Sequence, residues 1–399
     1  MNLFSVTINN RMMKIFILCC MNYNNKNFVY FDNAATSFHK PKEVKNAVIN
    51  ALNLYTANPG RSGHKLSQNV AEIVYDTREN LKDFFGANSY DLIFTKNCTE
   101  ALNLAILGTL KKGEHVITTC YEHNSVLRPL EHLKKMGVEV TNLDSDLQNF
   151  HEEFEEKIRP NTRLVITTFV SNVTGEICDV KAVNKICKKF NIKHLVDGAQ
   201  ASGHLNIDLN DLGCDMFAFA GHKGLLSFTG VGGLFVKNLE DLKPIIFGGT
   251  GTDSKNLIQP TDTIEGYESG TIPTIPIISL NAGVKFLKQN FSKILEKERK
   301  LSEILYKKLK NIKFLEIYSK KSSLNVFSFN ITNLDSGTVA NMLNDKFNIC
   351  VRAGLHCAPL IHKRNKSESQ GAVRVSLDFY NTFEEIDFLV YALKHIANA

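Results

Sequence analysis

The sequence predicts an α/β protein with a large unit built on a mostly parallel sheet and a smaller α+β unit after it. Between residues 91 and 235, short runs rich in β-branched and aromatic residues alternate with amphipathic stretches. Such alternation is typical of parallel strands joined by helices that cover the sheet. After Pro273 and Pro276 one long helical pattern and a few strands follow, which indicates a second unit. The 399 residues are enough to bury a core in each unit.

The expected elements follow one another in a regular order. Two helices come first, at 41–55 and 65–85, separated by a turn-rich segment at 58–63. In the large unit we expect strands at 92–95, 115–118, 138–140, 164–167, 194–197 and 216–219, with helices at 100–110 and 180–190. In the smaller unit we expect a helix at 277–310, strands at 326–331 and 372–377, and a closing helix at 383–396.

The chain is expected to divide into a leader at 1–20, a segment at 21–40 that packs with the small unit, a large unit at 41–280 and a small unit at 281–399. The apolar run at 15–20 is too short to span a membrane and lacks a small-residue cleavage site. We therefore expect neither secretion nor membrane anchoring. The leader is interpreted as disordered or untranslated, with Met21 as the working start.

Composition narrows the class of function. The net charge is +6, but Lys and Arg are scattered along the chain, which argues against nucleic-acid binding. The nine cysteines show no CxxC spacing, and a chain of this length needs no disulfide framework. We predict no metal site, and a reducing cytoplasm fits this cysteine usage best.

The strongest chemical signal is the run 217–224, an apolar strand that ends in a small-residue turn carrying His222 and Lys223. Ligands bind outside the carboxyl ends of strands in open α/β sheets, so Lys223 is well placed to form a Schiff base with an aldehyde cofactor. Another buried-type strand ends in Asp197, one strand–helix–strand step earlier. A carboxylate against the ring nitrogen of pyridoxal phosphate would make the ring an electron sink. The plainer interpretations are a solvent-facing lysine and a helix-capping aspartate.

Further polar residues follow other strands. Cys98 and Thr99 lie where a strand passes into a helix, and free backbone N–H groups with the Thr99 hydroxyl would suit a phosphate there. Asn172 and His123 also follow expected strands. Each of these residues alone is more often structural, but together they converge on one rim of the sheet.

From Tyr30 to the C-terminus the chain resembles the class V, fold type I pyridoxal-phosphate enzymes, and within them the cysteine desulfurases and selenocysteine lyases. The matching motifs lie at 30–36, 99–103, 171–175, 197–200, 221–223, 268–271, 352–357 and 374–377. The resemblance implies a large domain with a sheet of the seven-stranded type and a smaller α+β domain. It also implies a homodimer with the active site at the subunit interface.

The resemblance further implies pyridoxal 5'-phosphate as cofactor and a role for each matched residue. In this assignment Lys223 forms the Schiff base, His123 stacks on the ring, Asp197 meets the ring nitrogen, Gln200 and Asn172 lie near the phenolic oxygen, and Cys98, Thr99 and His222 hold the phosphate. Thr271 would add a phosphate contact from the partner subunit. Arg374 would bind the substrate carboxylate together with Asn172, a task that suits a bidentate guanidinium.

Cys357 decides the expected reaction within this family, because a desulfurase needs a nucleophile near the substrate sulfur. It lies beside Arg352 and His356, and positive neighbours lower the pKa of a thiol. A free cysteine is more often a buried small hydrophobe. We expect Lys223 to remove the Cα proton of L-cysteine and Cys357 to take the sulfur as a persulfide. L-Alanine would be released, with His123 as the acid.

Two positions depart from the family pattern. Ala220 stands where relatives commonly have a serine hydroxyl on the phosphate, and Leu355 stands where a histidine is frequent. The stretch from Cys357 to Arg374 is short and resembles the compact loop of the group II desulfurases. Such relatives often rely on an acceptor protein for turnover. The sulfur could serve iron–sulfur clusters, tRNA modification or selenium metabolism, and the sequence does not choose between them.

Three other functions stay open. A selenocysteine lyase would run the same chemistry on selenium. A class V aminotransferase or lyase would not use the thiol of Cys357. A non-catalytic protein would bind the cofactor without turning over a substrate.

Overall fold

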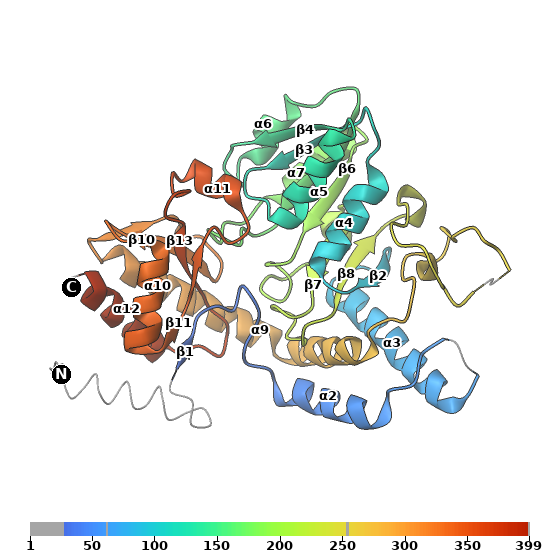
Figure 1. Cartoon of the computed structure of the whole chain (residues 1–399), viewed down its shortest axis with the longest axis horizontal. Helices are drawn as coiled ribbons and strands as arrows, with labels where there is room; N and C mark the ends of the chain where they lie inside the picture. Colours follow the sequence, from blue (N-terminus) through green and yellow to red (C-terminus); the bar gives the residue numbers. More distant parts are fainter. Residues whose placement is uncertain (1–27, 61–62, 253–254, 398–399) are drawn as a thin grey trace.

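The computed structural model describes residues 28–60, 63–252 and 255–397, and a seven-stranded sheet forms its centre (Figure 1). The strands lie in the order β2-β8-β7-β6-β5-β3-β4. Their bounds are β2 Asp91–Thr95, β3 His115–Thr119, β4 Glu139–Leu143, β5 Thr162–Thr168, β6 Lys193–Asp197, β7 Met216–Ala220 and β8 Gly232–Val236. Strand β8 runs antiparallel to β7 and β2, whereas the other neighbouring pairs are parallel. The predicted α/β class with a mostly parallel sheet is confirmed.

Helices cover both faces of this sheet because the strand residues alternate between two apolar clusters. Ile93 faces a cluster that includes α4 (Cys98–Thr109) and α5 (Asn124–Lys135). Its neighbours Leu92 and Phe94 face the opposite cluster, which includes α3 (Lys65–Phe84), α7 (Val180–Lys189) and α9 (Thr274–Lys310). The remaining helices of this part are α2 (Lys42–Leu54), α6 (Phe150–Glu155), α8 (Leu209–Leu212) and the 3-10 turns η1 (Leu239–Asp241) and η2 (Ile264–Gly266).

A second, four-stranded sheet lies toward the C-terminal end of the chain, in the order β12-β13-β10-β9 (Figure 1). Its strands are β9 Leu315–Ile317, β10 Val326–Ile331, β12 Arg352–Gly354 and β13 Ala372–Ser376, and neighbours are antiparallel. The helices α10 (Ser336–Phe347), α11 (Pro359–Arg364) and α12 (Phe383–Ala397) belong to the same part of the chain. A third apolar cluster joins this sheet to α10, α12 and the second half of α9.

The N-terminal segment lies against the second sheet. Strand β1 (Val29–Tyr30) pairs in parallel with β11 (Ile349–Cys350), and Asp32 bridges to Ser376. Helix α9 runs without interruption past residue 280, where the sequence suggested a boundary between units. That division of the chain stays a prediction, and the leader at 1–20 lies outside the described residues.

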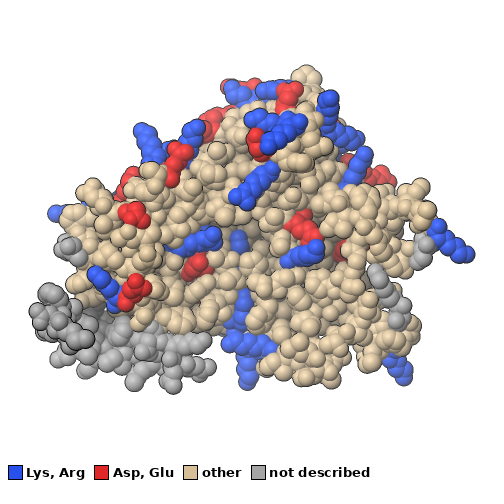
Figure 2. All heavy atoms as spheres, viewed as in Figure 1, with Lys and Arg blue, Asp and Glu red and all other residues tan. Residues whose placement is uncertain are grey.

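Within the described residues, no helix combines the length and the apolar character needed to cross a membrane. On the face seen in Figure 2, Lys and Arg side chains stand interspersed with Asp and Glu.

Candidate active site

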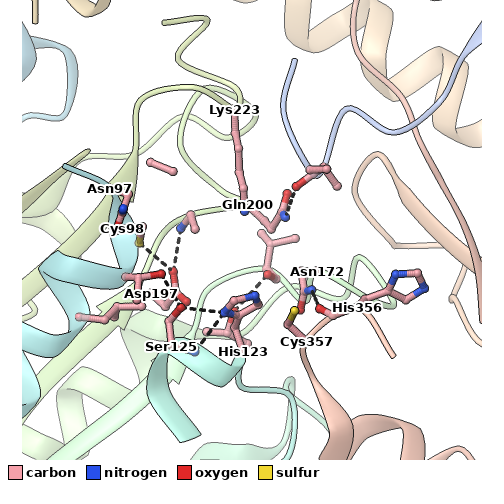
Figure 3. A pocket seen from close by; sticks show the side chains of 18 of the residues that line it. Asn97, Cys98, His123, Ser125, Asn172, Asp197, Gln200, Lys223, His356 and Cys357 are labelled. Carbon is pink, nitrogen blue, oxygen red and sulfur yellow. Dashed lines mark hydrogen bonds between the residues drawn. The ribbon is translucent and has the colours of Figure 1, made fainter. Parts of the chain in front are cut away.

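A cavity of about 220 Å³ opens at the carboxyl ends of the central strands, where open α/β sheets commonly bind ligands. Segments that follow β2, β3, β5, β6 and β7 form one wall, and the segment between β12 and β13 closes the other (Figure 3). The cavity brings together ten of the residues predicted from the sequence: Lys223, Cys357, His123, Asp197, Gln200, Asn172, Cys98, Thr99, His222 and Arg374. Thr271 lies elsewhere, in a hollow with Lys96 and Glu100.

Lys223 stands on the turn after β7 and points its side chain toward Gln200 across the cavity (Figure 3). Burial lowers the pKa of the Lys223 amine, although the carboxylate of Asp197 opposes this fall. No hydrogen bond or ion pair of its Nζ occurs among the described residues. An unengaged amine with a lowered pKa is the form that attacks an aldehyde carbon.

Asp197 ends β6 and is held in place by two donors. Its Oδ1 accepts the backbone N–H of Ala199 at 2.9 Å and the thiol of Cys98 at 3.6 Å. Burial, followed by the charge of Asp197, raises the pKa of the Cys98 thiol, so this thiol stays protonated. The expected contact of Cys98 with a phosphate therefore depends on its backbone N–H rather than on its sulfur.

Backbone N–H groups that could bind a phosphate lie at the N-terminus of α4. Asn97 caps the helix by accepting the N–H of Glu100 at 3.0 Å, whereas the N–H groups of Cys98 and Thr99, in the same first turn, have no intrahelical partners. Free N–H groups and the helix dipole together favour an anion. The Thr99 hydroxyl lies 2.7 Å from the Ser125 hydroxyl on the neighbouring helix α5.

His123 precedes α5, and Ser125 fixes its ring. Its Nδ1 accepts the backbone N–H of Ser125 at 3.1 Å, so in the neutral ring the proton lies on Nε2. Burial lowers the pKa of His123 to about 4 despite the opposing carboxylate of Asp197. At neutral pH the ring is uncharged, which suits stacking on another aromatic ring and leaves one N–H to donate.

His222 shares this neutral state. Burial, with Lys223 and Lys40 adding positive charge nearby, lowers its pKa to about 4. Its Nδ1 is buried without a hydrogen-bond partner among the described residues. A buried unpaired ring nitrogen at the cavity wall is an open position for a ligand atom.

Two arginines bring positive charge from the second sheet. Arg352 and Arg374 are cross-strand partners on β12 and β13, and both line the cavity. Arg374 is 2% exposed, pairs with Asp32 at 2.8 Å and donates to the carbonyl of Asn172 at 3.0 Å. Its Nε is buried without a partner in the described part of the chain. That unused donor fits the predicted contact with a substrate carboxylate.

The amides of Asn172 and Gln200 are oriented by the backbone. Asn172 Nδ2 donates to the carbonyl of His356 at 2.7 Å, and Gln200 Nε2 donates to the carbonyl of Ala34 at 2.9 Å. Each amide keeps a second N–H, because a side-chain NH₂ carries two.

Cys357 lies on a strained turn between the two sheets. Both His356 (φ +49°) and Cys357 (φ +57°) adopt the left-handed region, which costs roughly 1–2 kcal/mol for each such residue. The turn is held because Asn124 N donates to the carbonyl of Cys357 at 2.6 Å and Asn172 holds the carbonyl of His356. These two hydrogen bonds hold the strained backbone that carries the half-buried thiol.

The expectation that His356 adds positive charge beside this thiol is wrong. His356 is 4% exposed, and burial, with Arg374 nearby, lowers its pKa well below the usual range. Its Nε2 lies 2.9 Å from the carbonyl of Ala372. Arg352 and Arg374 line the same cavity as Cys357 and carry positive charge there.

The two departures from the family pattern have different surroundings. Ala220 is buried in the cavity wall, and the hydroxyl side chains that line the same cavity include Thr99 and Ser125. Leu355 is 40% exposed and does not line the cavity.

Sequence reasoning missed several residues of this site. Ser125 and Asn97 are short polar residues at helix starts, where capping alone explains them. Asp32 is 342 positions from its partner Arg374, and nothing in a single sequence pairs them. The sequence placed Arg352 beside Cys357 in one motif, but its cross-strand pairing with Arg374 was not predicted.

Comparisons with known proteins agree with this geometry. The family model described as aminotransferase class-V matches residues 29–389. A probable cysteine desulfurase of Methanothermobacter thermautotrophicus is 33% identical over 382 residues, covering 93% of this chain and 95% of the relative. A probable cysteine desulfurase of Pyrococcus abyssi is 35% identical over 387 residues, with 93% and 94% covered. A cysteine desulfurase from Thermococcus onnurineus superposes with a TM-score of 0.87 at 31% identity over 99% of both chains.

Proposed function

The chain belongs to the class V aminotransferase family, and from this premise we propose that it is a pyridoxal 5'-phosphate-dependent cysteine desulfurase. It converts L-cysteine to L-alanine and takes the sulfur onto Cys357 as a persulfide. One observation carries the proposal: Lys223 from the large sheet and Cys357 from the segment between β12 and β13 line the same cavity. Backbone strain that neighbouring contacts maintain is typical of functional sites, which supports a role for this thiol.

The residues fit the cofactor. The cavity offers an unengaged lysine, a carboxylate, a neutral imidazole ring and a helix N-terminus, together with the unpaired Nδ1 of His222. When bound, pyridoxal 5'-phosphate supplies an electron sink that makes the Cα proton of an amino acid acidic. The residues that would hold it are Lys223 at the aldehyde carbon, Asp197 at the ring nitrogen, His123 on the ring face, Gln200 and Asn172 at the phenolic oxygen, and Cys98, Thr99 and His222 at the phosphate.

Two side chains of the protein bind the substrate and accept its proton. Arg374 binds the carboxylate of cysteine and fixes its orientation. The lowered pKa of Lys223 favours its neutral form, which accepts the Cα proton.

Cys357 is the nucleophile that accepts the sulfur. Its thiolate forms a bond to the substrate sulfur, the Cβ–S bond breaks, and that electron pair stays with the carbon skeleton. Protonation of the skeleton then yields alanine. His123, with its proton on Nε2, is the neutral donor beside this reaction.

Replacing Arg374 by lysine is expected to raise the KM for L-cysteine about ten- to a hundredfold, because lysine keeps the charge but loses the planar guanidinium, which is oriented by Asp32 and the carbonyl of Asn172 and keeps its Nε for the substrate carboxylate. Steady-state alanine formation at varied cysteine measures this. The matched control is Arg299→Lys, on an exposed i,i+4 pair with Glu303, which should behave as wild type. A KM that stays unchanged in Arg374→Lys would remove Arg374 from the substrate site.

The assay that tests the proposed function is alanine formed from L-cysteine by the purified, cofactor-loaded protein, with and without reductant. Alanine formation that a persulfide-clearing reductant accelerates supports the proposal. A preference for selenocysteine would point to the lyase instead, and keto-acid formation from the amino donor would point to an aminotransferase.

We further propose that the protein is a homodimer and that it works in the cytoplasm with a sulfur-acceptor protein. A homodimer would bring Thr271 of one copy to the phosphate site of the other, and the 99% exposed Leu257 and 78% exposed Ile258 are apolar surface that a second copy would cover. The persulfide would pass to an acceptor protein in the cytoplasm, as in iron–sulfur cluster assembly. Sedimentation of the purified chain tests the dimer, since a monomer at working concentration would remove Thr271 from the site.

A further inference from the structure

The turn that carries Lys223 is held from two sides. On one side it packs against the backbone near Ser202, since a Cβ added at Gly224 would lie 2.3 Å from the carbonyl oxygen of Ser202. On the other side lies the N-terminal segment at 36–40. The turn itself contains Leu226 in the left-handed region at φ +64°, so outside contacts are needed to keep its shape.

The N-terminal contacts concentrate on one carbonyl. The oxygen of His222 lies within reach of four donors: Ser37 N at 3.2 Å, Thr36 Oγ1 at 3.2 Å, Ser37 Oγ at 3.1 Å and Lys40 Nζ at 3.2 Å. This peptide group joins His222 to Lys223, so whatever holds its oxygen also fixes where the Lys223 side chain leaves the backbone.

Lys40 determines which acceptor the Ser37 hydroxyl can use. Its Nζ donates to Ser37 Oγ at 2.5 Å. Because that oxygen accepts from Lys40, the single proton of the Ser37 hydroxyl must go elsewhere, and the available acceptors are the carbonyls of His222 and Lys223, the latter at 3.1 Å. The ammonium thus acts on the turn both directly and through Ser37.

The surroundings of Lys40 are unusual for a lysine. The side chain is 8% exposed, and among the described residues it forms no ion pair. Burying an ammonium without a carboxylate is unfavourable. Burial lowers the pKa of Lys40 to about 8, and the charge of Asp378 offsets part of this fall. At pH 7 Lys40 is therefore protonated in most molecules. The buried charge is directed at the carbonyl oxygen of His222 and the hydroxyl of Ser37 rather than at a salt-bridge partner.

We propose that Lys40 is a positioning residue, which through Ser37 and the carbonyl of His222 holds Lys223 in line for proton transfer. The inference rests on the proposed function for the role of Lys223, but the contact itself does not. Lys40 touches neither substrate nor cofactor in this account; it acts on the turn from behind the cavity wall.

The test compares Lys40→Met, which keeps the length but removes the charge, with Lys40→Arg and with Lys42→Met. Lys42 is exposed two residues later on α2 and serves as the matched control. Hydrogen exchange of the cofactor-loaded protein without cysteine is followed at Leu226 and Ser227, whose N–H groups bond to the carbonyls of Lys223 and Gly221 within the turn. The kinetics with L-cysteine are then measured on the same preparations.

In Lys40→Met we expect exchange at these two amides to rise about tenfold, as for the loss of one charged hydrogen bond, with no rise in the central strands. We expect kcat to fall about ten- to a hundredfold with KM unchanged, because misplacement of the base affects the chemical step. Lys40→Arg should recover part of both effects, and Lys42→Met should match wild type.

Wild-type exchange and kcat in Lys40→Met would overturn the inference, and so would exchange that rises equally throughout the fold. If Lys40→Met does not fold, Ser37→Ala removes the shared hydroxyl and is judged by the same two readouts. If wild type makes no alanine, the proposed function fails, whereas local exchange still decides whether Lys40 holds the turn.

Discussion

Replacing Lys223 by alanine is expected to lower alanine formation from L-cysteine about ten-thousandfold, the upper range for loss of a general base. The change removes both the attachment point of the cofactor and the amine that accepts the Cα proton. The variant should also lose the visible absorbance that a lysine-bound cofactor gives. Alanine formation and absorbance, measured on the same preparation, check both effects.

Folding should be unaffected, because no hydrogen bond or ion pair of Lys223 Nζ to other described residues is lost. The matched control is Lys111→Ala, an exposed lysine two residues after the last residue of α4. Its activity and melting temperature should equal those of wild type. Activity above a few per cent in Lys223→Ala would mean that another group performs the proton transfer.

Replacing Cys357 by alanine is expected to lower alanine formation on the order of a thousandfold, since loss of a nucleophile removes the covalent route. The absorbance of the bound cofactor should stay, because the thiol is not among the residues that would hold it. This combination separates Cys357 from Lys223. Sulfide and alanine release are measured together with the spectrum.

Cys350 provides the control, because it is also half-buried but does not line the cavity. Cys350→Ala should keep the wild-type rate. A Cys357→Ala protein that still released alanine and sulfide at the wild-type rate would show that the thiol is incidental, as in an aminotransferase or lyase of the same family.

Much of the fold could be predicted because its signals are local. The strand at 326–331 was predicted with the observed bounds, and the parallel strands were placed to within a few residues. Strand β8 was missed because it begins with two glycines, which lower β propensity. Glycine is needed at position 233 because a Cβ there would lie 2.5 Å from the ring of Phe219 on the neighbouring strand β7.

Some features of the candidate site could be predicted from the sequence, and others depend on residues far apart in the chain. Lys223 and Asp197 follow strands, so the topology of a parallel sheet brings them together. The neutral state of His356 could not be read from its position beside Cys357, because it depends on burial by residues far along the chain. The contact of Lys40 with the carbonyl of His222 spans 182 positions and is equally invisible in the sequence.

Under the proposed function, Cys357 takes the sulfur of the substrate. The most direct test is the mass of the peptide that carries Cys357, after the cofactor-loaded protein meets L-cysteine without reductant. If Cys357 is the sulfur acceptor, this peptide gains one sulfur atom, an equivalent amount of alanine forms, and reductant removes the gain. Alanine formed while the Cys357 peptide keeps its original mass would contradict this role of Cys357.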